Sequence, residues 1–320
     1  MQEDQTEAGE SAGQGVTPGQ GGGAIPGLPV PDPAFILTLP RPSPIPVLIS
    51  VPHGGRRYPP ALLARMRMPA QTSLRLEDRL VDRLGEAVAA RTGASLLVAR
   101  APRAMIDLNR SPRDLDWEML GLAAPGRDVP NGRARSGLGL VPRRLPGTGD
   151  IWCGALAMAE VEERIALVHA PYHRALGDTL EALRERWGAA LLIDLHSMPS
   201  LPRIGGQAAA QIVLGDRFGA TCQGALVASA FAHFVTTGRA AAHNRPYAGG
   251  YVLDSHAAPC RGIHAFQLEI DRAAYLDSAL TDPGEGFGAM VDMLAGLVRR
   301  MGDEVAVLGG RRSGWAEAAE

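Results

Sequence analysis

Short apolar runs and longer amphipathic stretches alternate along this chain. The short runs are rich in β-branched and aliphatic residues and lie between turn signals, which is typical of buried strands. They predict strands at Val47–Val51, Ser95–Arg100, Ala104–Leu108, Ala189–Leu195, Gln211–Gly215 and Ala265–Ile270. Apolar residues recur at helical spacing in the longer stretches. These predict helices at Leu76–Arg91, Ala155–Ala170, Tyr172–Trp187, Gln223–Phe234 and Gly286–Met301.

Helices that alternate with buried-type strands predict an α/β fold with a largely parallel or mixed sheet. Strands that are apolar throughout are buried on both faces, so helices should cover both sides of this sheet. Pro171 should interrupt the long helical stretch that follows Trp152, because a proline ring clashes with the preceding helical turn.

Local composition divides the chain into a globular part and two loose ends. Residues 1–32 are rich in Gly, Gln, Glu and Pro, which predicts a disordered tail. Residues 33–308 should form a single domain, and residues 309–320 a second loose end. Within the domain, residues 111–149 are full of Gly, Pro and Arg and predict a long irregular excursion, of the kind that is often functional.

The overall composition excludes several classes of function. With 46% hydrophobic residues in 320, the chain can bury a large core, and its net charge of −2 gives no reason to expect nucleic acid. No apolar run is long enough to span a membrane, and the acidic N-terminus is unlike a secretory signal, so we expect a cytoplasmic protein. All 32 basic residues are arginine, which excludes Schiff-base, pyridoxal phosphate and Walker A chemistry because each needs a lysine.

Two of the apolar runs lead into histidines. The run Ile45–Val51 is followed by Pro52 and His53, and the run Ala189–Leu195 is followed by His196. In sheets that helices cover, ligands bind in the crevice outside the carboxyl ends of the strands. Two imidazoles and one carboxylate at that edge would form an open zinc site, with water as the fourth ligand.

Glu77 and Asp78 are the candidate carboxylates for this site. Asp78 should lie near the N-terminus of the predicted helix, where the helix dipole favours a negative charge. Both residues could instead cap that helix. A rival metal pair is His169 and His173, which stand four residues apart on a predicted helix, with Pro171 between them.

Arginine and asparagine follow the predicted strand Ala104–Leu108. The guanidinium of Arg110, beside Asn109, suits bidentate binding of a substrate carboxylate. Arg103 could polarise a carbonyl and stabilise an oxyanion. Asp107 could alternatively form a salt bridge with an arginine that only stabilises a turn.

The last predicted strand carries a buried carboxylate. Alternation directs Phe266, Leu268 and Ile270 to one face and Gln267, Glu269 and Asp271 to the other. A carboxylate near the end of a buried strand is costly unless it is paired. Glu269 is therefore either a general base for a metal-activated water or a partner in a structural salt bridge.

The loop from Asn244 to Tyr251 is rich in turn residues and contains Tyr247 as a second tyrosine. Aromatic and hydrogen-bonding groups on such a loop could form a lid over a small substrate. An ordinary exposed turn is the alternative interpretation.

Together these motifs resemble the N-formylglutamate amidohydrolase family. They are, in the family's order, Ser50–Gly55, Glu77–Asp82, Ile106–Arg110, Asp194–Ser197, Asn244–Tyr251 and Leu268–Ile270. The match extends from about Val47 to Arg272. The family is related to the zinc carboxypeptidases and aspartoacylases, so the resemblance implies a three-layer α/β/α sandwich around a mixed sheet.

The resemblance also implies a ligand set. It assigns zinc to His53, Asp78 and His196, with Glu77 as a rival ligand. The His-x-x-Glu spacing of the carboxypeptidases is absent after His53, where Gly54, Gly55 and Arg56 follow.

The remaining roles are implied in the same way. Asn109 and Arg110 would bind the substrate carboxylate, Arg103 would polarise the scissile carbonyl, and Glu269 would be the base. Asn244, Tyr247 and Tyr251 would contribute to substrate binding.

The hypothesis from the sequence is zinc-dependent hydrolysis of an N-acyl amino acid. The expected reaction converts N-formyl-L-glutamate and water to formate and L-glutamate, a step of histidine degradation. One alternative is a zinc amidase or carboxypeptidase for another acyl amino acid or a peptidoglycan fragment, with residues 111–149 building a different pocket. Another is a non-catalytic binding protein with the same fold. The expected partner is a small molecule, and no pattern predicts an oligomeric state.

Overall fold

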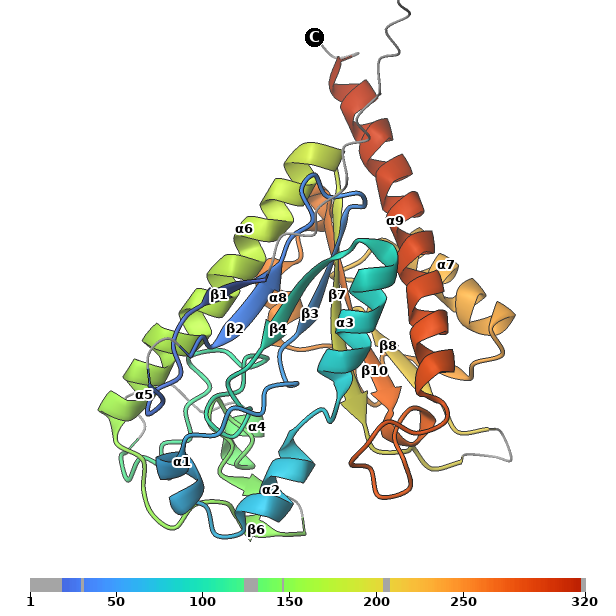
Figure 1. The fold of residues 1–320 in the computed structure, drawn as a ribbon. Helices are drawn as coiled ribbons and strands as arrows, with labels where there is room; N and C mark the ends of the chain where they lie inside the picture. Colours follow the sequence, from blue (N-terminus) through green and yellow to red (C-terminus); the bar gives the residue numbers. More distant parts are fainter. Residues whose placement is uncertain (1–18, 30–31, 124–131, 146, 204–207, 318–320) are drawn as a thin grey trace, which may run out of the picture.

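A mixed β-sheet forms the centre of the computed structural model, which describes residues 19–29, 32–123, 132–145, 147–203 and 208–317 (Figure 1). Within these residues the sheet has eight strands. They are β1 (Gln20–Gly22), β2 (Phe35–Thr38), β3 (Val47–Val51), β4 (Ser95–Ala99), β7 (Ala190–Met198), β8 (Ile212–Gly215), β9 (Ala241–His243) and β10 (Ile263–Asp271).

The strand order is β1-β2-β4-β3-β7-β10-β8-β9. The four central strands β4, β3, β7 and β10 run parallel to one another, as do β8 and β9. The pairs β1–β2, β2–β4 and β10–β8 are antiparallel. The prediction of a mixed, largely parallel sheet is therefore confirmed.

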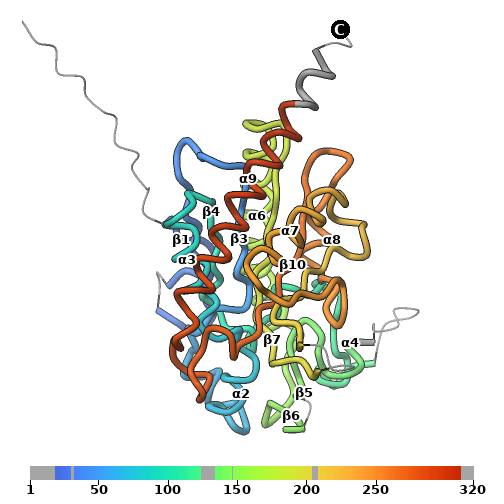
Figure 2. The backbone as a smooth tube through the Cα atoms, turned by 90° about the vertical axis from the view of Figure 1, so that its right-hand side faces the viewer, coloured from blue at the N-terminus to red at the C-terminus, as the bar shows by residue number. Residues whose placement is uncertain are grey.

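Helices cover both faces of this sheet, which confirms the predicted three layers. One face is covered by α6 (Ala170–Trp187), which continues from α5 (Met158–Arg164) through a π-helical turn, η1 (Ile165–His169). The other face is covered by α3 (Val81–Thr92), α7 (Gly224–Thr236) and α9 (Phe287–Glu317). Figure 2 looks onto this second face, where α9 lies in front of the sheet.

Shorter elements gather at one end of the sheet, around the carboxyl ends of the parallel strands. Helix α2 and strand β6 lie below the sheet in both views (Figures 1 and 2). The elements at this end are α1 (Pro60–Ala64), α2 (Pro69–Leu76), α4 (Gly132–Arg135), β5 (Arg144–Leu145), β6 (Gly149–Asp150) and η3 (Arg272–Ala274). The other two short elements, α8 (Tyr251–His256) and η2 (Pro259–Arg261), lead up to the start of β10. The described parts of residues 111–149 contribute α4, β5 and β6 to this end.

Alternation along β7 separates the two halves of the core. Leu191, Ile193 and Leu195 pack into the apolar cluster on the side of α3 and α9, while Ala190 and Leu192 belong to the cluster under α6. Burying a leucine or isoleucine side chain contributes about 1.5–3 kcal/mol to stability, so the register of this strand is strongly fixed. Asp194 and His196 follow on the α6 face, where the alternation places polar side chains in a buried layer.

The predicted strand at Ala104–Leu108 is wrong. This segment is a series of turns, and its backbone is not part of the sheet. Its apolar side chains are buried in the cluster under α6, which explains the misleading apolar pattern. The Asp107 N–H donates to the carbonyl of Leu140 at 2.7 Å, a partner from the 111–149 excursion and not from a strand.

The predicted helix at Leu76–Arg91 is two helices. Helix α2 ends at Leu76 and α3 begins at Val81, because Leu80 adopts a left-handed conformation with φ of 55° that cannot continue a right-handed helix. Glu77 and Asp78 lie in the connection, and the N-terminus of α3 has no side-chain capping bond. The alternative in which they cap a helix is therefore wrong.

Pro171 does not interrupt its helix, contrary to the prediction. The chain remains helical from Met158 to Trp187, and the π-helical turn η1 immediately precedes the helix that contains Pro171. A π-helical turn shifts the backbone hydrogen bonds by one residue, and this adjustment accommodates a residue that has no N–H.

Both predicted loose ends contain regular structure. Strand β1 lies within residues 1–32 and pairs with β2, and Ile25 is buried. Helix α9 continues to Glu317, well past residue 308. Residues 1–18, 30–31 and 318–320 lie outside the described residues, and the assignment of residues 33–308 to a single catalytic domain stays a prediction.

Candidate functional site

His53 and His196 lie side by side at the carboxyl end of the sheet. His53 follows β3 by two residues, and His196 lies within β7, which continues to Met198 beyond its predicted end. Because β3 and β7 are neighbouring parallel strands, both imidazoles reach the same edge. Their ring centroids are 4.8 Å apart.

Asp78 joins the two histidines. Its N–H donates to the carbonyl of His53 at 3.0 Å, so the α2–α3 connection is attached to the strand end. Its Oδ2 lies 3.0 Å from His196 Nδ1 and 3.5 Å from His53 Nδ1. Within the part of the chain that the structure describes, these three buried residues are the only group arranged to hold a metal ion. Glu77 pairs with Arg79 at 3.1 Å, so Asp78 and not Glu77 meets the histidines.

Each imidazole is oriented by a second carboxylate. His53 Nε2 donates to Asp107 Oδ1 at 2.7 Å, and His196 Nε2 donates to Asp194 Oδ2 at 2.8 Å. Both Nδ1 atoms therefore face Asp78 with their lone pairs available to a cation. Carboxylates that bind the far nitrogen of a histidine are a recurrent feature of metal sites, where they fix the tautomer and the ring orientation.

The electrostatics of this group favour a cation. Burial alone would raise the pKa of Asp78, but the neighbouring imidazoles of His196 and His53 hold it well below its usual value. Burial alone would lower the pKa of His196, yet Asp194 raises it well above the usual value. The ionised carboxylates thus attract positive charge, and a metal ion that binds neutral imidazoles would replace the proton.

The Nδ1 atom of His53 tests whether a metal ion fits. His53 is only 2% exposed, and its Nδ1 atom has no hydrogen-bond partner. A buried polar atom without a partner is costly unless something binds it. Two imidazole nitrogens and one carboxylate oxygen are a donor set that zinc accepts, so the residues present fit the ion.

Glu269 lies beside this group on the next strand. It is the Cα partner of His196 across the parallel pair β7–β10, and Gln267 Nε2 donates to its Oε1 at 2.8 Å. Burial raises the pKa of Glu269 to about 7, and Asp78 adds to this effect. A carboxyl group with this pKa can both accept and donate a proton near neutral pH.

The segment after Pro102 holds Arg103 by a salt bridge. Arg103 Nε lies 2.9 Å from Asp107 Oδ2, so the predicted Asp107–Arg salt bridge is present, and Arg103 also lines the cavity beside His53. The other oxygen of Asp107 accepts from His53 Nε2 and from the Asn109 N–H, the latter at 2.9 Å. Asp107 therefore fixes an arginine and a histidine at the same time.

Asn109 and Arg110 line the same wall, but protein groups already occupy much of the Asn109 side chain. Its Oδ1 accepts from the Val252 N–H at 2.9 Å, and its Nδ2 donates to Gln267 Oε1 at 3.1 Å. A Cβ on Gly250 would lie 2.5 Å from Asn109 Oδ1, so this close approach requires glycine. Arg110 donates from Nη1 to the Asn109 carbonyl at 3.0 Å.

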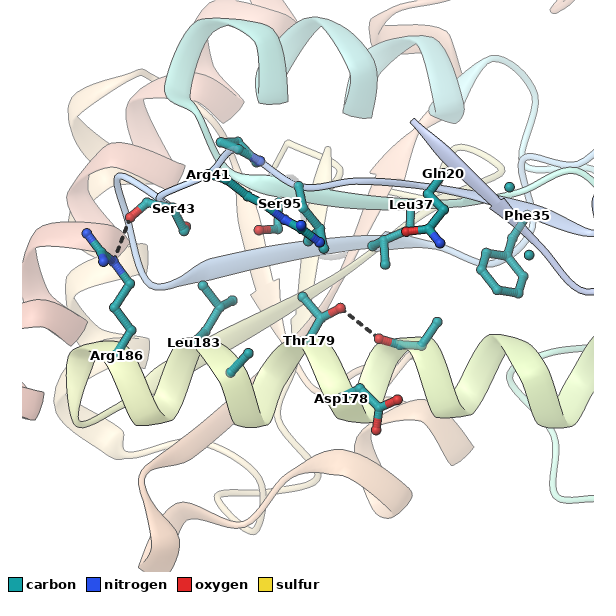
Figure 3. Close-up of a pocket in the computed structure, with 16 residues that line it drawn as sticks. Gln20, Phe35, Leu37, Arg41, Ser43, Ser95, Asp178, Thr179, Leu183 and Arg186 are labelled. Carbon is teal, nitrogen blue, oxygen red and sulfur yellow. Dashed lines mark hydrogen bonds between the residues drawn. The ribbon is translucent and has the colours of Figure 1, made fainter. Parts of the chain in front are cut away.

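A cavity of about 170 Å³ connects these side chains. Its wall includes His53, Asp78, His196 and Glu269, together with the guanidinium-bearing residues Arg75, Arg103, Arg110 and Arg272. Four arginines around so small a space favour an anionic ligand. A larger cavity of about 470 Å³ lies between β2 and α6, where Phe35 and Thr179 line it (Figure 3), and it contains none of these side chains.

Two residues predicted to bind substrate lie elsewhere. The Asn244 side chain binds the turn at 216–218, with its Nδ2 2.7 Å from Asp216 Oδ1, and it does not line the cavity. Tyr251 packs against His173, with ring centroids 5.1 Å apart, and is also absent from the cavity wall. Tyr247 does line the cavity, where burial and the charge of Glu269 raise the pKa of its phenol.

Sequence reasoning missed several residues of this site. Arg272 follows β10 and donates to the Glu77 carbonyl at 2.6 Å, while Gln267 bridges Asn109 and Glu269. Gln267 could have been found from the alternation that selected Glu269, because both lie on one face of β10. The role of Asp107 as the partner of His53 depends on a pairing between distant segments, whereas Asp194 precedes its partner His196 by only two residues on the same face of β7.

The remaining predictions concern other histidines and the membrane. His169 and His173 are not a metal pair, since both bind backbone carbonyls through Nε2. None of the helices within the described residues combines the length and the apolar character that crossing a membrane requires.

Comparisons with known proteins agree with this geometry. The model of the family described as N-formylglutamate amidohydrolase matches residues 45–276. A protein of Pseudomonas aeruginosa named N-formylglutamate deformylase is 32% identical over 238 residues, which cover 73% of this chain and 83% of that protein. A protein of the same name from Pseudomonas putida is 31% identical over 251 residues, 75% of this chain and 84% of that protein.

Two solved structures share the fold. The crystal structure of N-formylglutamate amidohydrolase from Ralstonia eutropha superposes with a TM-score of 0.76 at 33% identity, covering 85% of this chain and 98% of that one. A gene product of Agrobacterium tumefaciens superposes with a TM-score of 0.61 at 18% identity, covering 85% of this chain and 96% of the other. The second similarity supports the fold alone.

Proposed function

Because the chain belongs to the N-formylglutamate amidohydrolase family, we propose that it hydrolyses N-formyl-L-glutamate to formate and L-glutamate. The observation that carries this proposal is the shared cavity, in which the group His53, Asp78 and His196 faces Glu269 and several arginines. A metal-ligand group supplies electrophilic chemistry, a buried carboxyl group supplies proton transfer, and arginines supply anion binding.

Zinc is the metal ion that we propose for this group. His53 and His196 would bind it through Nδ1 and Asp78 through a carboxylate oxygen, while Asp107 and Asp194 hold the imidazoles in orientation. When bound, zinc would polarise the substrate carbonyl and lower the pKa of a water molecule.

Glu269 would move the protons of the reaction. As a carboxylate it accepts a proton from the water that adds to the formyl carbon, and as a carboxylic acid it returns this proton to the amide nitrogen. The C–N bond then breaks, and formate and the free amino group of glutamate are released. A pKa of about 7, caused by burial, suits both directions of transfer.

Arginines would bind the negative charges of substrate and transition state. Arg103 is held by Asp107 beside His53, where its guanidinium can stabilise the developing oxyanion. Arg110 would bind a carboxylate of glutamate, and Asn109, whose side chain is largely engaged, would position Arg110 and the start of α8 at Val252. Tyr247 would contribute a neutral phenol as a hydrogen-bond donor.

A metal assay combined with an activity assay tests the proposal. Purified protein should contain about one zinc per chain and release formate from N-formyl-L-glutamate. Chelation should abolish formate release and added zinc should restore it. Activity that survives complete removal of metal would contradict the proposal.

A substrate panel separates this function from the alternatives. N-formyl-, N-acetyl- and N-succinyl-glutamate, formyl derivatives of other amino acids and a peptidoglycan fragment should be compared by kcat/KM. Preference for another acyl group or for the fragment would favour a different amidase or carboxypeptidase. No turnover of any substrate, with binding retained, would favour a non-catalytic binding protein.

A further inference from the structure

One continuous helical stretch supplies side-chain donors to the turns that carry the cavity arginines. Arg164 Nη1 donates to the Met105 carbonyl, His173 Nε2 to the Leu108 carbonyl and His169 Nε2 to the Arg110 carbonyl, each at 2.9 Å. These donors belong to α5, η1 and α6. Two of their acceptors lie within the wrongly predicted strand at residues 104–108, and the third is two residues beyond it.

The turns need these donors because residues 104–108 are not part of the sheet. A buried backbone carbonyl without a hydrogen bond is costly, and a strand would have satisfied it through its neighbour. Leu108 and Arg110 are both buried. Their carbonyls belong to the peptide groups before Asn109 and after Arg110, so the two histidine bonds hold the backbone at both ends of this dipeptide.

The π-helical turn places the donors on one side of the helix. Arg164 and His169 are five residues apart, and in a regular α-helix that spacing turns side chains about 140° away from each other. The turn η1 occupies residues Ile165–His169 and adds one residue to the repeat, which brings both side chains towards the turns. Such turns often mark functional sites.

The histidines act as neutral donors. A carbonyl only accepts, so His173 carries its proton on Nε2, and its Nδ1 then accepts from His256 Nε2 at 2.9 Å. The rings of His173 and His256 are parallel, with centroids 5.2 Å apart, and the Tyr251 ring packs against His173. Burial lowers the pKa of His173 to about 2 and that of His256 to about 4, so both stay neutral near pH 7.

We propose that His169 and His173 are positioning residues that hold Asn109 and Arg110 against the cavity through the backbone carbonyls of Arg110 and Leu108. The expected effect on KM rests on the proposed function, in which Arg110 binds the glutamate carboxylate. A contact that is equally strong in substrate and transition state affects KM and leaves kcat nearly unchanged.

Matched amide variants test this role without a large change in polarity. His173→Gln and His169→Gln place an N–H near the position of Nε2, whereas His173→Asn and His169→Asn place it near Nδ1, too short to reach the carbonyl. His233→Asn is the control, because His233 Nε2 also donates to a carbonyl at 2.9 Å, that of Met293 in α9, far from the cavity.

Two readouts are measured for each variant. We expect each Asn variant to raise KM about tenfold with kcat within about threefold of wild type, and each Gln variant to restore KM to within about threefold. Hydrogen–deuterium exchange of a peptide covering residues 103–113 should be faster in the Asn variants only. The control should match wild type in both readouts.

The outcomes separate this inference from the proposed function. A wild-type protein without formyl-glutamate hydrolysis would contradict the proposed function, and exchange would then show whether the histidines hold the segment. Active wild type with unchanged KM and exchange in the Asn variants would overturn the inference. Equal losses in Asn and Gln variants, or Asn variants that do not fold, would assign the histidines a structural role and would also overturn it.

Discussion

Glu269 and His196 lie opposite each other as Cα partners on the neighbouring parallel strands β10 and β7. Because paired residues of adjacent strands direct their side chains to the same face, the carboxyl group and the imidazole share one layer under α6. The hydrogen-bond register of the sheet thus fixes the distance between the two side chains more firmly than a flexible loop would. Gln267 and Asp194 repeat the same pairing two residues earlier.

The first prediction concerns Glu269→Gln. The amide keeps the size of the side chain but cannot accept the proton of water, so kcat should fall by about 10²–10⁴-fold. Zinc content and KM should stay close to wild type, because Glu269 belongs to neither the metal group nor the arginine wall. Steady-state kinetics with metal analysis checks this. Full activity of the variant would place the base elsewhere.

The second prediction concerns the partner of His53. Asp107→Asn removes the negative charge that orients His53 Nε2–H, so zinc affinity should fall about 10–100-fold. Competition with a chromophoric chelator measures this affinity.

Asp216→Asn is the matched control. Asp216 is buried and accepts from His243 Nε2 at 3.0 Å, away from the metal group. Its zinc affinity should equal that of wild type. If both variants bind zinc as tightly as wild type, Asp107 does not tune the metal site.

How much of the site the sequence could predict depends on the type of contact. His53 and Glu269 were found because each follows or lies on a continuous apolar strand, and strand alternation is a local property. The order of parallel strands then brings their ends together. Local patterns left the choice between Asp78 and Glu77 open, because both lie in a connection between two helices where one helix was predicted. The left-handed Leu80 in this connection was not foreseeable, since leucine rarely adopts that conformation.

The misidentified strand shows the limit of local patterns. Residues 104–108 alternate like a strand, but their backbone partners include Leu140 and side chains of α5 and α6. Such partners come from segments distant in sequence. The same holds for Asn244, whose turn-rich context suggested a lid although its side chain binds Asp216.

The third prediction concerns acid stability. Burial lowers the pKa of folded His256 to about 4, whereas an unfolded histidine titrates at about 6.5. Below pH 6.5, His256 is therefore protonated in the unfolded chain but not in the folded chain. The free energy of unfolding falls as the pH falls towards 4. Between pH 7.5 and 5 this histidine should cost the protein about 2 kcal/mol.

Urea unfolding of wild type and His256→Gln at both pH values measures this effect. The glutamine variant lacks the titrating group, so its free energy of unfolding should decrease by about 2 kcal/mol less over the same interval. Parallel pH profiles for the two proteins would show that His256 is not held neutral by burial.

The last prediction concerns the contact between Gly250 and Asn109. In Gly250→Ala the new methyl group would lie 2.5 Å from Asn109 Oδ1, so residue 250 and the start of α8 must move away from Asn109. The hydrogen bond that Asn109 Oδ1 accepts from the Val252 N–H must then weaken. We expect a loss of about 1–3 kcal/mol in the free energy of unfolding and a higher KM, because Asn109 neighbours the arginine wall. Gly288→Ala, where a Cβ would meet no atom within 4 Å, is the control and should leave KM unchanged. Denaturant unfolding and steady-state kinetics measure both, and a Gly250→Ala enzyme with wild-type KM would separate this loop from substrate binding.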